Sequence, residues 1–499
     1  NQSYYSQIMV DIGRRSRSQP VDDVTESELH RLLGCMLEKA YTSRLLTDLP
    51  NSSPLSGSGG SEAAAALLAS SNCRELIELD YKLHGCLDNT DGQLCDTYPP
   101  YLFLPSSCLR RRPEQELAYP DDFYAVCKSA SKARVRGRFP APALMFEGKL
   151  VCRSSALSAW PEAYSRSAIG VVSSWFSSMS VGRKSTPNSM APTSGESEAA
   201  DSESVASATG ISSNSFFDRT RGKDMALLDC LRVRQIVDLT VEAKFYKYRV
   251  PLPLSSTEKI DKRGRYKDYK LCVIPYPGCE FFRVWSIGHG LSMSGVHFAW
   301  HNPSVTAQLR FDDQLPLCAV DIDWQRYRDW DLTRLTANYM RLLLGYLVEF
   351  PDDGGIMLHC VSGWDRTPMF ISLLRCLLWS EGLCHASLSA MQLLYLTLAY
   401  DWFLFGHRLP DRMQKDECVL HYCFHFLHSV SRDRHLSMLR WYPHLQKPQQ
   451  QQQPQQLTDR TVRLRQLCDI FFSAYSNAEK RRAAALAAAN SASADQFNG

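Results

Sequence analysis

Apolar residues recur every three or four positions in several stretches of the chain, a spacing that places them on one face of a helix. The first stretch follows Thr25, which forms a capping-box pair with Glu28 and so predicts a helix that begins there. A longer stretch begins at Asp331. The same periodicity predicts helices over the ranges 367–380, 387–405 and 411–430. A terminal helix is indicated by an apolar stripe that consists of Leu464, Leu467, Phe471 and Tyr475.

Short apolar runs bounded by turn residues predict strands. Two runs, 143–146 and 149–152, flank Glu147-Gly148, and this arrangement predicts a hairpin within 138–155. Residues 75–104 mix apolar runs with turn signals, which favours an α+β segment. Further strands are expected at 235–239, 271–274 and 356–358. Since strands and helices alternate over most of the chain, the pattern predicts an α/β domain.

Three segments are too polar or too biased in composition to contribute to a core. Residues 51–71 are rich in Ser, Gly and Ala and are expected to form a flexible loop. Residues 173–215 are dominated by Ser, Ala, Gly, Thr and Pro, so we expect a disordered insertion inside one domain. Residues 446–456 form a Gln/Pro tract that is typical of a solvated linker.

The composition narrows the class of protein. With 44% hydrophobic residues among 499, the chain can build a packed core. A net charge of +3 does not describe a nucleic-acid binder, so no nucleic-acid partner is expected. The 17 cysteines lack the spacing of a disulfide framework and indicate a reducing compartment. No signal peptide is visible in residues 1–17, and charges interrupt the apolar region 371–405, so no transmembrane segment is expected.

One string carries the candidate chemistry: Cys360, five intervening residues and Arg366. The spacing alone is weak, since about one chance match is expected in a chain with this many cysteines. The context makes it specific, because a buried strand precedes Cys360, Gly363 lies within the loop, and a helix follows Arg366 with Pro368 near its first turn. Such a loop turns its backbone N–H groups inward and forms an anion-binding nest at a helix N-terminus.

The chemistry predicted for this loop is phosphoryl transfer to sulfur. The nest would stabilise the Cys360 thiolate and a bound phosphate, and the Arg366 guanidinium would hold two phosphoryl oxygens. A phosphocysteine intermediate would form and then be hydrolysed by water, with no metal and no cofactor required. Thr367 is expected to hydrogen-bond the sulfur or the phosphate, and His359 is expected to brace the loop by hydrogen bonding.

The leaving group also requires an acid. Asp365 lies within the loop and is the first candidate, and Asp331, in an acidic and aromatic segment, is the second. The alternative for Asp365 is an ion pair with Arg366 that braces the loop. Trp364 is either part of the binding site or only a packing residue.

At this loop the chain resembles the myotubularin phosphoinositide phosphatases, whose loop reads His-Cys-Ser-Asp-Gly-Trp-Asp-Arg-Thr. The likeness is stronger to a divergent branch of that family, the egg-derived tyrosine phosphatase or jumpy branch, whose loop reads His-Cys-Ile-Ser-Gly-Trp-Asp-Arg-Thr-Pro. Ser362 and Pro368 match this branch, and Val361 is a conservative variant. The resemblance covers most of 130–430, apart from the serine-rich insertion.

The resemblance implies a cysteine-dependent, protein tyrosine phosphatase-like fold with a central mixed sheet flanked by helices. The implied phosphatase domain spans 115–440 and is followed by a linker and terminal helix (441–499). The region before it, 1–114, is α+β and is either a separate module or part of the catalytic domain. No lipid-binding PH-GRAM pattern is visible in that region.

The resemblance also implies an activity: removal of the 3-phosphate from phosphatidylinositol 3-phosphate and phosphatidylinositol 3,5-bisphosphate. Cys360 would be the nucleophile, Arg366 would bind phosphate, and Asp365 would be the acid. The implied substrate-binding residues are the consecutive loop positions Val361, Ser362, Gly363, Trp364, Asp365, Arg366 and Thr367. The wider family has a second loop aspartate where this chain has Ser362. The implied partner is phosphoinositide lipid at a membrane surface, and the implied location is cytoplasmic, peripheral at endomembranes.

Two rival functions stay open at this point. The same Cys360 and Arg366 would serve a protein tyrosine or dual-specificity phosphatase, because only the width and charge of the pocket separate the classes. A non-catalytic phosphoinositide-binding scaffold is less compatible with the presence of both residues. Basic residues in 244–270 would attract an anionic membrane or headgroup, or would form an ordinary solvated loop. His407 and Arg408 would line the pocket or follow a helix end.

Overall fold

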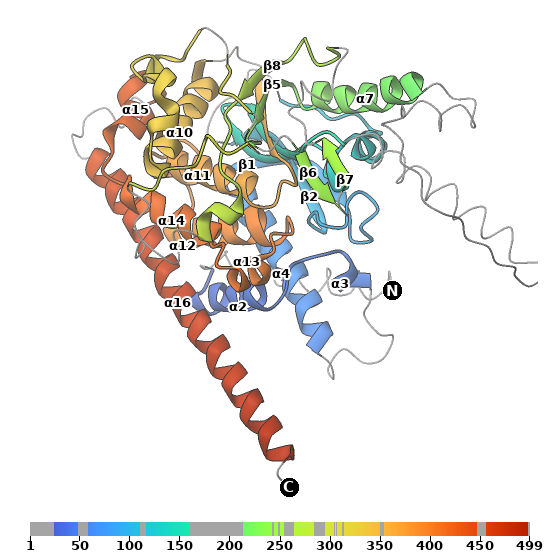
Figure 1. Cartoon of the computed structure of the whole chain (residues 1–499), viewed down its shortest axis with the longest axis vertical. Helices are drawn as coiled ribbons and strands as arrows, with labels where there is room; N and C mark the ends of the chain where they lie inside the picture. Colours follow the sequence, from blue (N-terminus) through green and yellow to red (C-terminus); the bar gives the residue numbers. More distant parts are fainter. Residues whose placement is uncertain are drawn as a thin grey trace, which may run out of the picture.

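A computed structural model of the chain describes most of its α/β region and the helices around it (Figure 1). Residues 173–212 of the expected insertion, 447–455 of the expected linker and 254–263 of the basic segment lie outside the described residues. The described residues are 24–47, 58–109, 116–158, 213–241, 244–247, 250–253, 264–283, 295–303, 305, 307–311, 314–349, 354–446 and 456–497.

The centre of the fold is a five-stranded sheet with the order β3-β4-β9-β5-β8. β3 and β4 are antiparallel, whereas β4, β9, β5 and β8 run parallel, so the sheet is mixed as expected. The strands are β3 (Ala141–Phe146), β4 (Lys149–Ser155), β5 (Val233–Asp238), β8 (Lys270–Val273) and β9 (Gly355–Cys360). Because parallel strands end at the same edge of a sheet, the segments after β4, β9 and β5 meet there.

The hairpin prediction is confirmed by β3 and β4. Glu147 and Gly148 form its turn, with φ of 49° and 79°. Positive φ at both central residues suits the right-handed twist of the two strands. β4 is buried along its whole length because β9 lies beside it.

Helices cover the sheet. Figure 1 shows α10 (Leu332–Glu349), α11 (Arg366–Ser380) and α14 (Val419–Ser429) on one side of it and α7 (Ser213–Cys230) on the other. All residues of α11 are buried, since it contacts the sheet as well as α14 and α16 (Gln456–Phe497). The predicted stripe of the terminal helix is confirmed on α16, whose far end extends past the body of the molecule in Figure 1.

The first predicted helix is also confirmed. α2 (Glu26–Glu38) begins after Thr25, and the capping box between Thr25 and Glu28 is present. The expectation of a flexible loop over 51–71 was wrong from Ser58 onward, because α4 spans Ser58–Glu78. Alanine is the strongest helix former, and Ala63, Ala66 and Ala69 of α4 are buried, while the helix contacts α2 and α12.

The helix predicted over 387–405 is divided. α12 (Ala390–Leu396) is followed by a π-helical segment, Thr397–Phe403. Asp401 of this wider turn forms an ion pair with Arg375 of α11, with Nη2 and Oδ1 2.8 Å apart and both side chains buried. π-Helical turns are often found near functional sites, and this one lies against the loop described below.

The remaining elements are short and surround the core. They are α3 (Arg44–Thr47), β1 (Tyr81–Asp88), β2 (Tyr101–Cys108), α5 (Phe123–Ala130), β6 (Lys244–Lys247), β7 (Val250–Pro253), α13 (Leu409–Gln414), α15 (Met438–Trp441) and 3-10 turns at Ser131–Ala133, Val135–Gly137, Cys279–Phe281, Leu317–Ala319, Trp324–Asp329, Arg434–Leu436 and Pro443–Leu445. Buried residues of α2, α4, β1 and β2 join the same apolar cluster as β9. No helix in the described part of the chain combines the length and apolar character that a membrane crossing requires.

Candidate active site

The predicted strand–loop–helix unit is formed by β9, the segment 361–365 and α11. Cys360 ends the strand and is 3% exposed. Its Sγ accepts hydrogen bonds from the backbone N–H of Gly363 at 3.3 Å and from Thr367 Oγ1 at 3.2 Å. Both donors hold the sulfur at the base of the loop. The expected contact between Thr367 and the sulfur is therefore confirmed.

Gly363 fixes the curvature of the loop. Its φ is +69°, a conformation that L side chains rarely adopt, and a Cβ here would lie 2.7 Å from the carbonyl oxygen of Ser154. Its own carbonyl oxygen accepts from Nη2 of Arg138 at 3.1 Å and from Nη2 of Arg153 at 3.2 Å. The residue that points its N–H at the sulfur is thus held at its carbonyl oxygen by two guanidinium groups.

Arg138 and Arg153 are each about 1% exposed. Nη1 of Arg138 donates to Thr97 and Nη1 of Arg153 donates to the carbonyl oxygen of Asp401 at 2.6 Å. Burial, together with the charge of Arg138, lowers the pKa of Arg153 to about 10, which still leaves it a cation at neutral pH. Two buried positive charges therefore lie directly behind a loop that is shaped to bind an anion.

Sequence reasoning did not identify Arg138 and Arg153 as site residues. A signal was present, because Arg153 lies inside a hairpin whose other strand residues are mostly apolar or small. A charge at such a position is buried on both faces and needs specific partners.

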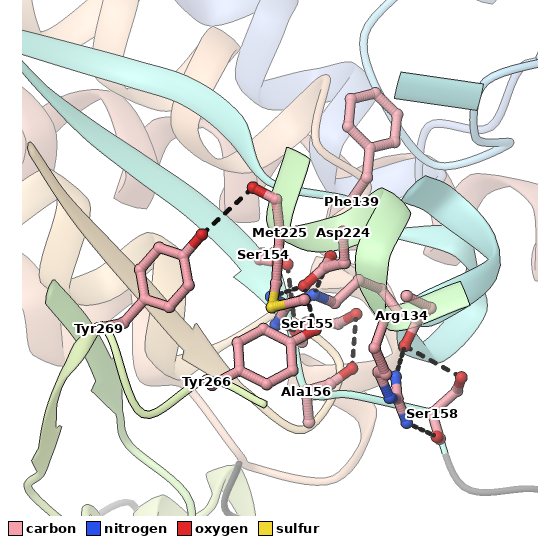
Figure 2. A network of polar contacts seen from close by, with 12 residues as sticks. Arg134, Phe139, Ser154, Ser155, Ala156, Ser158, Asp224, Met225, Tyr266 and Tyr269 are labelled. Carbon is pink, nitrogen blue, oxygen red and sulfur yellow. Dashed lines mark hydrogen bonds and ion pairs between the residues drawn. The ribbon is translucent and has the colours of Figure 1, made fainter. Parts of the chain in front are cut away.

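A second polar network supports the loop from the β4 side (Figure 2). Arg134 forms a two-point ion pair with Asp224 of α7, at 2.8 and 2.6 Å, and donates to the carbonyl oxygen of Ser155 at 3.1 Å. The Tyr266 hydroxyl donates to the same carboxylate at 2.7 Å. Ser155 pairs with Cys360 in the sheet, so α7 is connected through these contacts to the strand that carries the cysteine.

The bracing hydrogen bond expected of His359 is made by its main chain. The imidazole is fully buried, and neither ring nitrogen has a hydrogen-bond partner among the described residues. Nδ1 lies 3.8 Å from Oδ1 of Asp238, and burial lowers the pKa of the ring. Bracing comes from the main chain instead, where the His359 carbonyl oxygen accepts from the N–H of Leu239 at 2.9 Å.

Arg366 is 6% exposed and begins α11. Its Nη1 donates to the carbonyl oxygens of Leu239 at 3.2 Å and Tyr276 at 3.0 Å. Leu239 follows β5 and Tyr276 follows β8. The backbone after these two neighbouring strands therefore holds the Arg366 guanidinium next to the loop. The predicted phosphate-binding arginine and the cysteine are therefore brought to the same edge of the sheet.

Asp365 is held by two basic side chains. Its Oδ1 lies 3.3 Å from Nδ1 of His407 and 3.2 Å from Nε of Arg412. Burial alone would raise the pKa of this carboxyl, but His407, Arg412 and Arg366 outweigh it, so the pKa lies below its usual range. In the free chain Asp365 is therefore a carboxylate.

The second acid candidate, Asp331, acts as a helix cap. Its Oδ1 accepts from the N–H of Arg334 at 2.8 Å and its Oδ2 from the N–H of Gly295 at 3.0 Å. Oδ1 is thereby committed to the start of α10, and Oδ2 is committed to the backbone of Gly295. Within the described part of the chain, no hydrogen bond or ion pair joins Asp331 to the loop, so the structure gives no support to its role as the acid.

Trp364 forms part of the rim above the loop. The indole is half-buried, and three arginine side chains lie near its ring. The Cζ-to-centroid distances are 4.2 Å for Arg136, 5.7 Å for Arg408 and 6.0 Å for Arg138. His407 joins this group through a 2.9 Å contact between its Nδ1 and the carbonyl oxygen of Trp364. The half-buried Trp364 therefore lies between buried Arg138 and the exposed Arg136 and Arg408, and its place in substrate binding stays a prediction.

The fold and the loop define the class of the protein. A mixed sheet flanked by helices, with cysteine and arginine on one loop at the carboxyl edge of its parallel strands, is a protein tyrosine phosphatase-like fold. A scan against family models finds no match.

Two curated proteins are similar to most of this chain. The chain is 39% identical over 387 residues to the phosphatidylinositol-3,5-bisphosphate 3-phosphatase MTMR14 of Homo sapiens and 37% identical over 385 residues to that of Mus musculus. The matches cover 76% and 75% of this chain and 55% of each relative, so the chain spans about half the length of these proteins. Over this shared region the chain is similar to these myotubularin-related proteins, as the loop indicated.

A glycine substitution tests the loop geometry. Gly363→Ala places a methyl group against the carbonyl oxygen of Ser154, so the loop must shift and the N–H must leave the sulfur. We expect phosphatase kcat/KM to fall by about 100-fold or more, because a misplacement of about 1 Å can cost that much. The control is Gly148→Ala, which has a similar φ of +79° but open space around a Cβ. Equal activity of the two variants, both confirmed folded by thermal unfolding, would contradict this account.

Proposed function

We propose that the chain is a phosphoinositide 3-phosphatase that hydrolyses the 3-phosphate of phosphatidylinositol 3-phosphate and phosphatidylinositol 3,5-bisphosphate. The observation that carries the proposal is the Cys360 sulfur, which receives hydrogen bonds from Gly363 and Thr367 at the base of a loop that ends in Arg366. The printed activity of the two relatives, a 3-phosphatase acting on phosphatidylinositol 3,5-bisphosphate, supports the choice of substrate.

In the first step the Cys360 thiolate attacks the phosphorus atom of the 3-phosphate. The S–P bond forms while the bond between phosphorus and the ring oxygen breaks, and that oxygen takes a proton to leave as a hydroxyl. The loop N–H groups and the Arg366 guanidinium stabilise the charge on the three phosphoryl oxygens during the transfer. In the second step water attacks the phosphorus, loses a proton and releases phosphate and the thiolate.

Asp365 is our candidate for the acid–base group of both steps. Its carboxylate form in the free chain suits the second step, in which it accepts the proton of the attacking water. The first step needs a protonated carboxyl. A bound phosphate dianion next to Asp365 raises its pKa, since a like charge disfavours the ionised form. The alternative role of Asp365 is an ion pair that only braces the loop. The partners in such a pair would be Arg412 and His407, which contact its carboxylate, and not Arg366.

The rim favours a lipid headgroup over a phosphotyrosine side chain. Arg136 and Arg408 are exposed and lie near the ring of Trp364. Guanidinium groups around the nest suit a polyanionic inositol ring, whereas phosphotyrosine presents an uncharged aromatic ring beside its single phosphate. The substrate class implies that the chain acts at a membrane surface from the cytoplasmic side, peripheral to endomembranes. No observation in the described residues favours the scaffold alternative.

A substrate panel tests the activity. Phosphate release is measured from all phosphoinositides and from phosphotyrosine peptides, with the wild-type chain and Cys360→Ser. We expect hydrolysis of the two 3-phosphorylated lipids by the wild type and loss of about 1,000-fold or more in the variant, whose hydroxyl is a poor nucleophile at neutral pH. The control is Cys230→Ser, which changes a half-buried cysteine on α7. Release from peptides alone would contradict the lipid substrate, and full activity of Cys360→Ser would contradict the mechanism.

The pH profile tests the role of Asp365. Arg412 holds the pKa of this carboxyl down, so Arg412→Met raises that pKa. As the pH falls, the carboxylate is then protonated earlier, and hydrolysis begins to decline at a higher pH than in the wild type. An opposite charge this near lowers a carboxyl pKa by about 1 to 3, so we expect the acidic limb of kcat to move up by about one pH unit. The measurement is kcat against pH with a water-soluble short-chain lipid.

Lys415→Met is the control, since Lys415 follows the same short helix and pairs with its Asp411 at 2.9 Å. Asp365→Asn is expected to abolish the acidic limb of the profile of kcat against pH. An acidic limb that stays in place in both Arg412→Met and Asp365→Asn would show that another group titrates there.

A further inference from the structure

Arg136 differs from the arginines on either side of it. Arg134 and Arg138 are buried and bound to Asp224 and to Gly363, as described above. Arg136 lies between them in sequence, is exposed, and has φ 54° and ψ 20°. This left-handed conformation is uncommon for a residue other than glycine, and such outliers cluster at functional sites.

The conformation directs Arg136 onto the loop. Its Nη1 donates to the Ser362 hydroxyl, and its Cζ lies 4.2 Å from the centroid of the Trp364 ring. Ser362 and Trp364 flank Gly363, whose N–H is directed at the sulfur. The Arg136 guanidinium is therefore positioned at the mouth of the nest by a hydroxyl and an aromatic face.

The neighbouring residues explain why the conformation persists. The backbone from Arg134 to Arg138 forms a 3-10 turn, Val135–Gly137, in which Gly137 also has positive φ, 71°. The buried partners of Arg134 and Arg138 fix both ends of this turn. The turn cannot change its backbone conformation without breaking the Arg134–Asp224 ion pair or the hydrogen bond from Arg138 to the Gly363 carbonyl oxygen.

Arg136 and Arg366 occupy different depths. Arg366 is 6% exposed at the base of the loop, where the transferred phosphate binds, whereas Arg136 is exposed at the rim. A guanidinium bond to phosphate is stronger than one to a neutral hydroxyl, so Arg136 can exchange the Ser362 hydroxyl for a phosphate oxygen. Besides the phosphodiester that both lipids carry, the 3-phosphate lipid has no second phosphomonoester to offer at the rim, whereas the 3,5-bisphosphate has one.

We propose that Arg136 determines specificity by binding a second phosphate on the inositol ring while the loop holds the 3-phosphate. The inference rests on the proposed function, because it requires a phosphoinositide substrate. Trp364 keeps the guanidinium plane over the rim, and the two fixed ends of the turn keep its side chain from leaving. The expected result is a preference for the bisphosphate that depends on this cation.

The test compares kcat/KM for soluble dioctanoyl phosphatidylinositol 3-phosphate and 3,5-bisphosphate. Arg136→Asn removes the charge with a residue that tolerates the left-handed conformation, and Arg136→Lys keeps a charge without the planar fork. We expect Arg136→Asn to lose about 10-fold or more on the bisphosphate, mainly through KM, and less than about threefold on the monophosphate. Arg136→Lys is expected to fall between the wild type and Arg136→Asn.

The matched control is Arg232→Asn. Arg232 also has a left-handed backbone, with φ 50°. It lies just before the first residue of β5, at the end of the strand away from the cysteine loop. Thermal unfolding checks that all variants are folded. Equal losses on both lipids, or no loss on either, would overturn the assignment of Arg136 while leaving the proposed function standing. A wild-type chain that hydrolyses neither lipid would overturn both.

Discussion

The carbonyl oxygen of Gly363, held by the buried guanidinium groups of Arg138 and Arg153, sets the geometry on which the site depends. With that oxygen fixed from behind, the same residue presents its N–H to the Cys360 sulfur. Removing two guanidinium ions from water is costly, and carbonyl oxygens and the Phe405 ring, 4.0 Å from Cζ of Arg153, offset part of that cost. What the arrangement provides is positive potential behind an anion site.

The support behind the loop extends to segments that are distant in sequence. Arg153 also binds the carbonyl oxygen of Asp401 in the π-helical turn, whose carboxylate pairs with Arg375 of α11. On the other side, Arg134 and Asp224 join α7 to the strand residue that pairs with Cys360 (Figure 2). The loop is thus fixed by α11, the π-helical turn and α7, which suits a site that must hold its donors in place before the substrate arrives.

The sequence pattern predicted those elements whose conformation is determined by neighbouring residues. The β9–loop–α11 unit, the hairpin at Glu147-Gly148 and the Thr25 cap each depend on residues close together in sequence. α4 was missed because Ser and Gly near its start suggested a loop, whereas its buried alanines are stabilised by packing against other helices. A composition rule contains no information about such tertiary contacts.

The candidate site divides in the same way. Cys360, Gly363, Arg366 and Thr367 could be predicted from one string. The partners that give them their chemistry could not: Arg138 and Arg153 precede Gly363 by 225 and 210 positions. The low pKa of Asp365 likewise depends on His407 and Arg412, which follow it on another element. Only the fold brings these charges together.

The central claim is that phosphate passes through the Cys360 sulfur. Rapid-quench measurements with a soluble 3-phosphate lipid labelled in its phosphate, followed by mass spectrometry of the chain, test it most directly. The account predicts about one labelled phosphate per chain, attached to Cys360, which forms and decays more slowly in Asp365→Asn because both protonation of the leaving group and activation of water are slowed. Turnover by the wild type with no labelled protein at any time, or label on a residue other than Cys360, would contradict it.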